Sequence, residues 1–417
     1  MTIQSDVERV YQSESRKVFA TLLRLLGDFE LAEEATQEAF TAAAQAWPEK
    51  GLPKNPGSWL ISTGRFKMID RLRRENRFQE LEPELALRWE EIEEDNRLKA
   101  SYEVHDDRLR LIFTCCHPAI DPKVQVPLTL REVCGLTTGE IARAYLTTHQ
   151  AMAQRIVRGK NKIRQAGIPY RVPELKDLPE RLLAVLRVVY LVFNEGYSAS
   201  SGETAVRTQL GQEAIRLGRL LHQLLPEPEV KGLLALMLLH ESRRETRLDE
   251  EGDIVLLADQ DRAMWDRGLI EEGDRLLTEA LSSGRFGPYT LQAAISAVHA
   301  QTARPEETDW AQILALYNLL QQVEPTPVVA LNRAVAVSMV RGPEAGLAIL
   351  DELLADGHLA DYALAHSARG KWLLELERRS EAFESYSAAL GLAGSASEKR
   401  FLEKCLAECR EQRISLD

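Results

Sequence analysis

The 417-residue sequence has little of what marks membrane-spanning, secreted or disulfide-stapled proteins. No apolar run approaches the roughly 18 residues that a bilayer-spanning helix needs. The first ten residues lack the basic flank and the apolar stretch of a secretion signal. The five cysteines are an odd number, with Cys115 and Cys116 adjacent, and they predict no disulfide framework in so long a chain. We therefore expect a protein of the reducing cytoplasm that makes no membrane contact.

Strand patterns are scarce as well. Aromatic residues make up 6% of the sequence, and the alternation of β-branched and aromatic side chains that predicts strands is nearly absent. Apolar residues instead recur at three- and four-residue spacing almost throughout, which predicts an all-α fold. The net charge of −12 argues against a protein that holds nucleic acid by bulk charge, but it leaves room for local basic patches.

Charge is sorted along the chain in a way that the net value hides. Residues 65–77 hold six basic and two acidic residues, residues 81–107 hold three basic and ten acidic residues, and residues 137–165 hold six basic residues and one acidic residue. Two basic segments joined by an acidic tether predict two separate contacts with a polyanion, which the tether itself repels.

The first basic segment, residues 56–78, is typical of an amphipathic helix. Its basic residues recur at helical spacing on a face other than the apolar stripe, so that face can line phosphates. Trp59 and Phe66 offer flat surfaces on which an unpaired base can stack, a contact worth about 1–3 kcal/mol. An ordinary helix with a solvated basic face and core aromatics is the alternative. The stripe consists of Leu60, Ile61, Gly64, Met68 and Leu72, and the basic face consists of Lys67, Arg71 and Arg74, flanked by Arg73 and Arg77.

The second basic segment has the pattern of a helix-turn-helix. Thr138 can cap a short helix and, after a turn, Thr148 can cap a second one that points Met152, Ile156 and Ile163 inward. The N-terminal turns of such a helix meet base edges in the major groove, where Gln pairs with adenine and Arg with guanine. A helical hairpin with a basic exterior is the alternative. The outward residues are His149, Gln150, Ala153, Gln154, Arg155 and Arg158, and Lys160, Lys162 and Arg164 follow where phosphates would run.

A third segment, residues 27–40, predicts a helix with two unlike faces. Its alanines make a narrow packing face, and an acidic group gathers on the outside. Because acidic side chains repel DNA, a basic protein partner is the functional interpretation, and a merely solvated face is the alternative. The outer group consists of Glu33, Glu34, Gln37 and Glu38.

Four motifs follow one another in a fixed order along the sequence. They are Ala32-Glu33-Glu34 with Gln37, Phe40 and Trp47; Gly57-Ser58-Trp59-Leu60; Ile69-Asp70-Arg71-Leu72-Arg73-Arg74; and, after the tether, the helix-turn-helix. This order resembles a bacterial RNA polymerase sigma factor of the extracytoplasmic-function (ECF) type, which keeps only sigma regions two and four. The resemblance covers roughly residues 10–166.

The resemblance implies a transcription initiation factor that is not an enzyme and needs no cofactor or metal. It would bind core RNA polymerase, at the β′ coiled coil and the β flap, and direct promoter DNA recognition. The docking residues would be Glu33, Glu34, Gln37 and Phe40. The minus-ten element would meet Lys54, Asn55, Ser58, Trp59, Arg65, Lys67, Arg71, Arg73 and Arg74. The minus-thirty-five element would meet Thr148, His149, Gln150, Gln154, Arg155, Arg158 and Lys162. Many members carry an Arg-x-Arg pair where this chain has Ala153 and Arg155. The resemblance therefore does not tell which bases this helix would read.

The C-terminal half resembles the long extension of one ECF subgroup that is expected to lack a dedicated anti-sigma factor, which makes the extension a candidate regulator. The matching motifs lie at residues 190–199, 233–240, 259–266, 287–294 and 327–334.

Repeats point the same way without any resemblance. Pro343-Glu344-Ala345 and Ser380-Glu381-Ala382 each open a helix, 37 residues apart, which predicts stacked tetratricopeptide-like repeats and a protein or peptide ligand on them. The expected domains are a region-two domain (1–80), an acidic linker (81–107), a region-four domain (108–168), a helical extension (169–300) and a repeat domain (301–417).

Two other functions compete with a sigma factor. A stand-alone helix-turn-helix regulator would leave the motifs before residue 80 without a role, and a helical enzyme would need a catalytic constellation that the sequence does not show. Polar residues of the C-terminal half lack the spacing of a zinc site such as HExxH, so buried polar networks are the better interpretation. These residues are Asn194, Glu195, His240, Glu241, Asp259 and Asp261. For Cys115, Cys116, Cys405 and Cys409 we expect buried packing roles.

Overall fold

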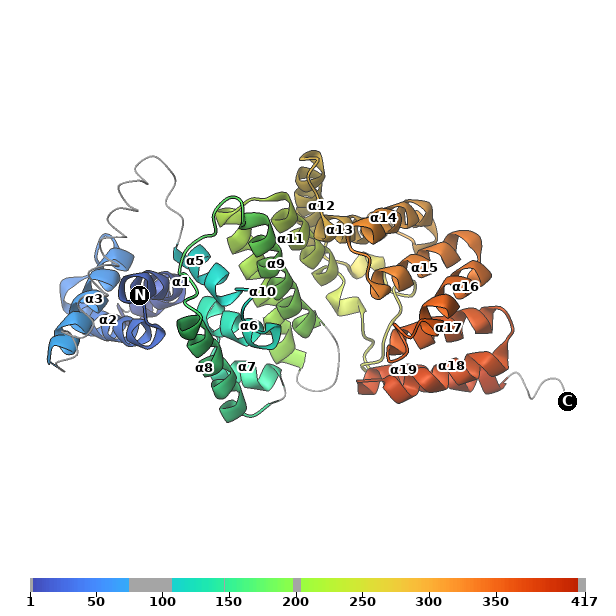
Figure 1. The fold of residues 1–417 in the computed structure, drawn as a ribbon, viewed down its shortest axis with the longest axis horizontal. Coiled ribbons are helices and arrows are strands. Elements are labelled where there is room, and N and C mark those ends of the chain that lie inside the picture. The colour runs from blue at the N-terminus through green and yellow to red at the C-terminus, as the bar shows by residue number, and fades with distance from the viewer. Residues whose placement is uncertain (1–2, 75–106, 146, 198–203, 412–417) are drawn as a thin grey trace. The chain divides into compact units, whose positions relative to one another are not determined.

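The computed structural model describes residues 3–74, 107–145, 147–197 and 204–411. Within these ranges the regular elements are helices, and the pairing of Leu248 with Ile254 is an isolated β-bridge. The prediction of an all-α fold is confirmed (Figure 1). The chain forms two compact units, residues 1–191 and 192–417. The predicted acidic linker lies outside the described residues, except for its last residue.

The first unit contains two helical modules. The first module consists of α1 (Ile3–Leu26), α2 (Phe29–Lys50) and α3 (Pro56–Arg74). The second module consists of α5 (Asp107–Cys115), α6 (Pro122–Thr129), the π-helical turn η2 (Leu130–Cys134), α7 (Thr138–Ala144) and α8 (His149–Gln165). The boundary between the two units falls inside the next helix, α9 (Leu178–Tyr197).

Asp28 sets the start of α2. Its carboxylate accepts hydrogen bonds from the backbone N–H groups of Glu30 (2.8 Å) and Leu31 (3.1 Å), as an N-cap does. Gly27, just before it, has a φ of 73°, a left-handed conformation that ends α1 and lets the chain turn into α2.

Small residues bring α2 and α3 close together. Ala32, Ala35 and Ala39 are fully buried, which confirms the narrow alanine face predicted for this helix. A Cβ atom on Gly64 of α3 would lie 2.7 Å from the backbone oxygen of Ala35, a distance that real Cβ atoms do not reach. Glycine at this position therefore lets α3 cross α2 backbone to backbone.

Two threonines start the helices of the predicted helix-turn-helix. Thr137 and Glu140 form a capping box, in which the Thr137 hydroxyl accepts from the Glu140 N–H (3.2 Å) and the Glu140 carboxylate accepts from the Thr137 N–H (2.7 Å). The cap of α7 is thus one residue earlier than the predicted Thr138. Thr148 caps α8 as predicted, since its hydroxyl accepts from the Ala151 N–H (3.1 Å).

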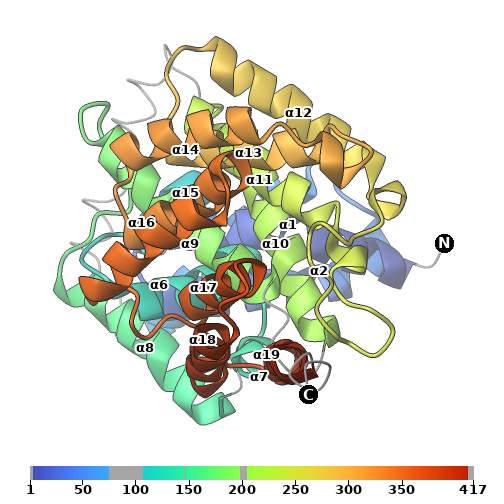
Figure 2. The same ribbon diagram turned by 90° about the vertical axis from the view of Figure 1, so that its right-hand side faces the viewer.

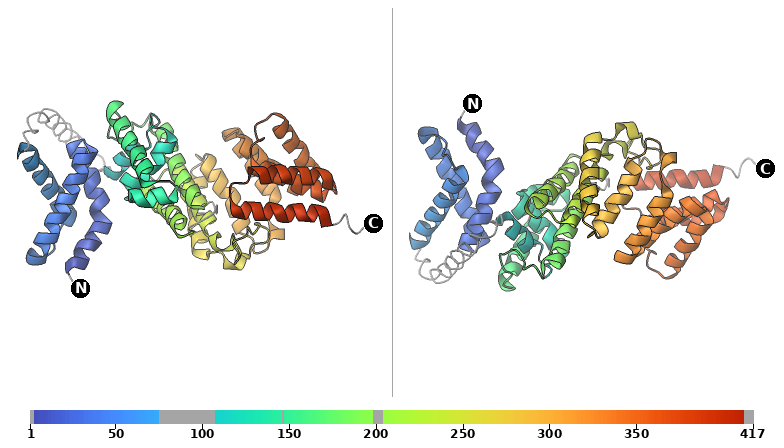
Figure 3. Two further views of the ribbon diagram at one scale, coloured as in Figure 1. Left: turned by 90° about the horizontal axis from the view of Figure 1, so that it is seen from below. Right: turned by 90° about the horizontal axis from the view of Figure 1, so that it is seen from above.

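The second unit continues with helices that follow one another along the chain. They are α10 (Thr204–Leu224), α11 (Pro228–Glu241), α12 (Arg267–Ser282), α13 (Pro288–Ala300), α14 (Trp310–Val323), α15 (Pro327–Arg341), α16 (Pro343–Ala355), α17 (Ala363–Glu375), α18 (Arg379–Leu392) and α19 (Ala396–Glu411), with short 3₁₀ turns at Arg244–Thr246, Arg262–Met264 and Pro305–Glu307. From α14 to α19 each helix packs against the next, as Figure 2 and Figure 3 show.

A partly buried carboxylate joins α11 to α13. Glu229 accepts hydrogen bonds from the backbone N–H groups of Gly287 (2.8 Å), Tyr289 (3.0 Å) and Thr290 (3.1 Å), so it satisfies the otherwise unpaired donors at the start of α13. Where the two helices cross, a Cβ on Gly232 would lie 2.7 Å from the Thr290 backbone nitrogen. The crossing therefore requires glycine.

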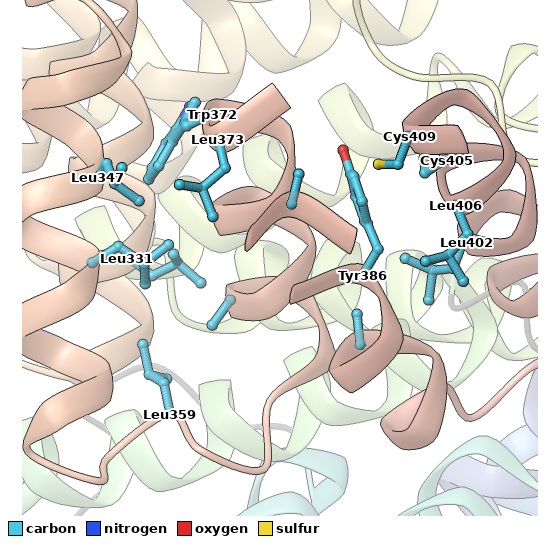
Figure 4. Packing of buried hydrophobic residues seen from close by; sticks show 14 of the residues in the cluster. Leu331, Leu347, Leu359, Trp372, Leu373, Tyr386, Leu402, Cys405, Leu406 and Cys409 are labelled. Atoms are coloured by element: carbon cyan, nitrogen blue, oxygen red, sulfur yellow. The ribbon is translucent and has the colours of Figure 1, made fainter. Parts of the chain in front are cut away.

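An apolar cluster fills the end of the second unit (Figure 4). It combines Leu331 of α15, Trp372 and Leu373 of α17, Tyr386 of α18 and Leu402 of α19. Consecutive helices thus share apolar side chains, and an ion pair between Arg369 of α17 and Asp351 of α16 (2.7 Å) adds to this packing. The predicted repeat starts at Pro343 and Ser380 fall at the first turns of α16 and α18.

Candidate polymerase and promoter interfaces

The predicted docking residues lie on two sides of α2. Glu33 and Glu34 are partly exposed and Gln37 is exposed, so they form an outer polar surface. Phe40 is 8% exposed, and its ring meets the Tyr11 ring edge-on at 4.9 Å. Phe40 therefore packs α1 against α2, whereas the three polar residues lie on the outer side of α2, where Glu33 and Glu34 form ion pairs.

The basic face of α3 is paired with the acidic face of α2. Lys67 Nζ lies 3.1 Å from Glu38 Oε2, and Arg71 Nη1 lies 3.2 Å from Glu34 Oε2. All four side chains are roughly two-fifths exposed, and such pairs contribute about 0–1 kcal/mol each. A phosphate or a basic partner can therefore replace either member at little cost.

The loop before α3 is shaped by its own hydrogen bonds. Asn55 is the N-cap of α3, because its side-chain oxygen accepts from the Ser58 N–H (3.1 Å) and its backbone oxygen accepts from the Trp59 N–H (3.2 Å). Lys54, Asn55 and Ser58 are exposed, so the predicted minus-ten loop presents polar atoms to solvent.

The aromatic and remaining basic residues of α3 differ in exposure. Trp59 is half-buried and its ring centroid lies 5.5 Å from that of the buried Trp47. Phe66 is 72% exposed, which suits a stacking surface and not a core role. Arg65 is partly exposed. Arg73 and Arg74 end α3, and their side chains lie outside the described set.

The helix α8 separates an inward from an outward surface. Met152, Ile156 and Ile163 are buried, as predicted from their spacing. Arg155 is partly exposed. The other outward residues predicted for the minus-thirty-five element are exposed: Thr148, His149, Gln150, Gln154, Arg158 and Lys162. The structure thus brings all seven of these residues to the outer face of one capped helix.

The structure also joins residues that the sequence pattern does not connect. Arg131 of η2 donates from Nη2 to Glu33 Oε1 of α2 at 2.6 Å, across 98 positions of sequence. Lys160 lies 3.6 Å from the second oxygen of Glu33, and Arg164 lies 2.8 Å from Asp28 Oδ2. Arg131 stands outside the basic segments, so periodicity could not single it out.

The polar residues of the second unit form one contact between helices and several local contacts. His240 Nε2 lies 3.2 Å from Ser296 Oγ, which links α11 to α13. Burial, with Arg243 and Arg247 nearby, lowers the pKa of His240 to about 3. Glu241 pairs with Arg244 at 2.7 Å, and Asp261 caps a 3₁₀ turn. Among the described residues no group of three or more His, Cys, Asp and Glu side chains is arranged to hold a metal ion.

The cysteines that drew attention are thiols inside the helical packing. Cys115, Cys116, Cys405 and Cys409 are all buried and free. Burial raises the pKa of Cys116 to about 12, and its sulfur lies 3.5 Å from the Thr129 hydroxyl. These environments disfavour the reactive thiolate and agree with packing roles.

Known proteins resemble this chain in three ways. Residues 10–78 match the family model of sigma-70 region 2, a span that covers most of α1 and all of α2 and α3. An uncharacterized protein of Rhizobium meliloti (strain 1021) is 45% identical over 406 residues, which cover 96% of this chain and 95% of that protein. This chain belongs to the same family. Residues 181–281, from α9 to α12, match a family of unknown function, DUF6596.

The region 2 match supports a sigma factor's role in RNA polymerase binding and promoter recognition. It coincides with the module that holds the acidic face of α2 and the basic face of α3. In the described part of the chain, no helix has the length and apolarity that a bilayer crossing demands.

Proposed function

We propose that this chain is an ECF-type sigma factor that binds core RNA polymerase and directs promoter recognition at the start of transcription. In this role it acts in the cytoplasm and is not itself an enzyme. The outer face of α2 (Glu33, Glu34 and Gln37) docks on the β′ coiled coil, α3 with the loop before it engages the minus-ten element, and α8 reads the minus-thirty-five element.

The observation that carries this proposal is the coincidence of the region 2 match with two adjoining charged faces. Residues 10–78 match sigma-70 region 2, and within that span α2 presents carboxylates while α3 presents Lys67, Arg71 and the exposed ring of Phe66. Carboxylates suit a basic protein partner, whereas a basic face with an exposed aromatic ring suits melted DNA.

The geometry of α8 supports the assignment of the upstream element. A helix that is capped at its first turn and lined with exposed Gln, His and Arg side chains can enter the major groove with that turn leading. In that arrangement Arg155 would meet a guanine edge and Gln154 an adenine edge. Region four would at the same time contact the β flap.

We assign the second unit a regulatory role through protein interaction. Helices α14 to α19 pack consecutively, and α16 and α18 begin 36 residues apart, which is close to the period of tetratricopeptide repeats. Such stacks present a surface to protein or peptide ligands.

Run-off transcription with purified core polymerase tests the proposal. Wild-type chain should start transcripts, and the double substitution Glu33→Lys with Glu34→Lys should abolish co-purification with core, because it reverses the charge of the docking face. Glu49→Lys is the matched control, since Glu49 is exposed on the same helix outside that face.

Two results would refute the proposal. One is a charge-reversed variant that is folded by circular dichroism and still binds core normally. The other is tight binding of a specific duplex by the free chain in a gel-shift assay with no transcripts from core, which would indicate a stand-alone regulator. Comparing the full chain with a truncation after residue 168 then tests whether the extension regulates transcription.

A further inference from the structure

Three cations of the second module meet two carboxylates of the first. Arg131 lies 2.6 Å and Lys160 3.6 Å from the two oxygens of Glu33, and Arg164 lies 2.8 Å from Asp28. Both modules belong to one compact unit, so these are contacts within that unit.

Lys160 is built into this contact. Its side chain is 15% exposed, lies 3.0 Å from the almost fully buried carboxylate of Glu132, and stands over the Phe29 ring at 5.5 Å. A buried carboxylate needs a cation beside it. Lys160 therefore has a fixed position in the second module, from which its charge also reaches Glu33 of the first.

Further contacts join the two modules at a distance from Arg131, Lys160 and Arg164. The Tyr170 hydroxyl is shared between the backbone oxygens of Ala20 (3.0 Å) and Asp107 (3.2 Å), and Arg24 lies 2.9 Å from the Asp107 carboxylate. The Tyr170 side chain is partly buried there. The arrangement thus has polar anchors at more than one place.

We propose that these contacts hold the free chain in a closed form that masks its own docking carboxylate. This inference rests on the proposed role of Glu33 in binding core polymerase. In the closed form Arg131 and Lys160 pair with the Glu33 carboxylate, which the polymerase would otherwise bind. Lys160 and Arg164 pair with Glu33 and Asp28 and are therefore not available to DNA phosphates. One closure therefore screens both the acidic docking face and part of the basic DNA surface.

The effect of the closed form on the affinity for core polymerase follows from the fraction of open molecules. When only the open fraction binds, the apparent Kd equals the intrinsic Kd divided by that fraction. Removing one partly exposed ion pair shifts such an equilibrium about two- to fivefold. Arg131→Gln should therefore tighten binding to core by about two- to fivefold, although Arg131 itself lies outside the docking and DNA-contacting sets.

Energy transfer in the full-length free chain tests closure without polymerase. Dyes would be attached at Glu49→Cys and Gln165→Cys, both exposed, with Cys134→Ser because the other four cysteines are buried. We expect Arg131→Gln to lower the transfer efficiency at low salt, and added salt to lower it in the wild type and by less in the variant, which keeps the pairs of Lys160 and Arg164. Lys123→Gln, which removes an exposed cation on α6 of the same module, is the matched control and should leave the efficiency unchanged.

Binding to core polymerase completes the test. Arg131→Gln should bind more tightly than wild type, Lys123→Gln equally, and Arg131→Lys should keep most of the closure. Unchanged energy transfer and unchanged affinity in Arg131→Gln, while Glu33→Lys loses core binding, would overturn the closed form and leave the docking role intact. If Glu33→Lys instead binds core normally, the docking role fails and with it the masking.

Discussion

Two sets of charged side chains, one in each unit, act in different ways. In the first unit, ion pairs between helices join half-exposed residues such as Glu34 with Arg71 and Glu38 with Lys67. In the second unit, Glu229 satisfies three backbone donors at the start of α13, and Arg262, 4% exposed, donates to the backbone oxygens of His299 (2.8 Å) and Thr302 (3.0 Å).

The difference separates replaceable from permanent contacts. A half-exposed ion pair is weak and can be exchanged for a phosphate or a partner's side chain. A buried charge that bonds backbone atoms cannot be exchanged without leaving those atoms unsatisfied. The exposed pairs between α2 and α3 therefore suit recognition, whereas Glu229 and Arg262 in the second unit serve stability.

The largest effect should come from the apolar core of the second unit. Leu373 is fully buried in α17, so Leu373→Ala should lower the free energy of unfolding by about 2–5 kcal/mol. Leu364→Ala, at a position 59% exposed in the same helix, is the control and should change it by less than about 0.5 kcal/mol. Denaturant titration measures both. Equal effects at the two positions would contradict the packing described for α17.

A change on the outer face of α8 should alter recognition and leave stability alone. Arg155→Ala should cost about 1–3 kcal/mol at a single upstream base position, because it would remove the proposed contact to guanine. Transcription from a set of promoters substituted one base at a time measures the effect. Unchanged selectivity among these promoters would rule out base reading by Arg155.

Acid should weaken the second unit through its buried histidine. The pKa of His240 is lowered to about 3 by burial, whereas in the unfolded chain it stands at 6.5, so unfolding takes up a proton between these values. Stability is therefore complete above pH 6.5 and falls by about 1.4 kcal/mol per pH unit as the pH drops toward 3. His299, lowered to about 4, adds to the slope.

The variant His240→Gln separates this effect from other titrations. Gln carries no titrating group, so the pH dependence of denaturant midpoints between pH 6.5 and 5 should become shallower while the slope from His299 remains. An identical pH slope in both proteins would show that His240 is not buried in its neutral form.

The smallest effect on stability should come from the paired faces of the first unit. Lys67→Gln removes one half-exposed ion pair with Glu38 and should cost less than about 1 kcal/mol of stability. Promoter opening should nevertheless weaken, with a shallower dependence on salt, because the proposed phosphate contact of Lys67 would be lost. A large drop in melting temperature would show that Lys67 stabilises the fold. The exposed pairs of the first unit would then differ less from the backbone-bonding charges of the second.

Much of the fold follows from periodicity and local chemistry. The alanine face of α2, the cap at Thr148 and the inward residues of α8 depend on neighbours within a few turns, which is why spacing predicts them correctly. The cap of α7 was misplaced by one residue because Thr137 and Thr138 are equally suited in sequence. The distance to Glu140 decides in favour of Thr137.

In the candidate sites, too, local features could be predicted and features that depend on distant residues could not. Exposure on a helix face could be predicted for Gln37, Gln154 and Arg158, whose sequence positions set their direction. The burial of Phe40 could not, because it depends on Tyr11 arriving from another helix. The five-part domain division and the roles of individual side chains stay predictions.

The amino-acid sequence by itself determined that this protein is helical, that its charges are segregated, and which faces of α2 and α8 point outward. These properties arise from interactions over three or four residues. Only the tertiary structure decided that Glu33 meets Arg131 and Lys160, and that Gly232 lies against Thr290. Such contacts join residues far apart in the chain, and their existence depends on how whole helices pack, which no local pattern encodes.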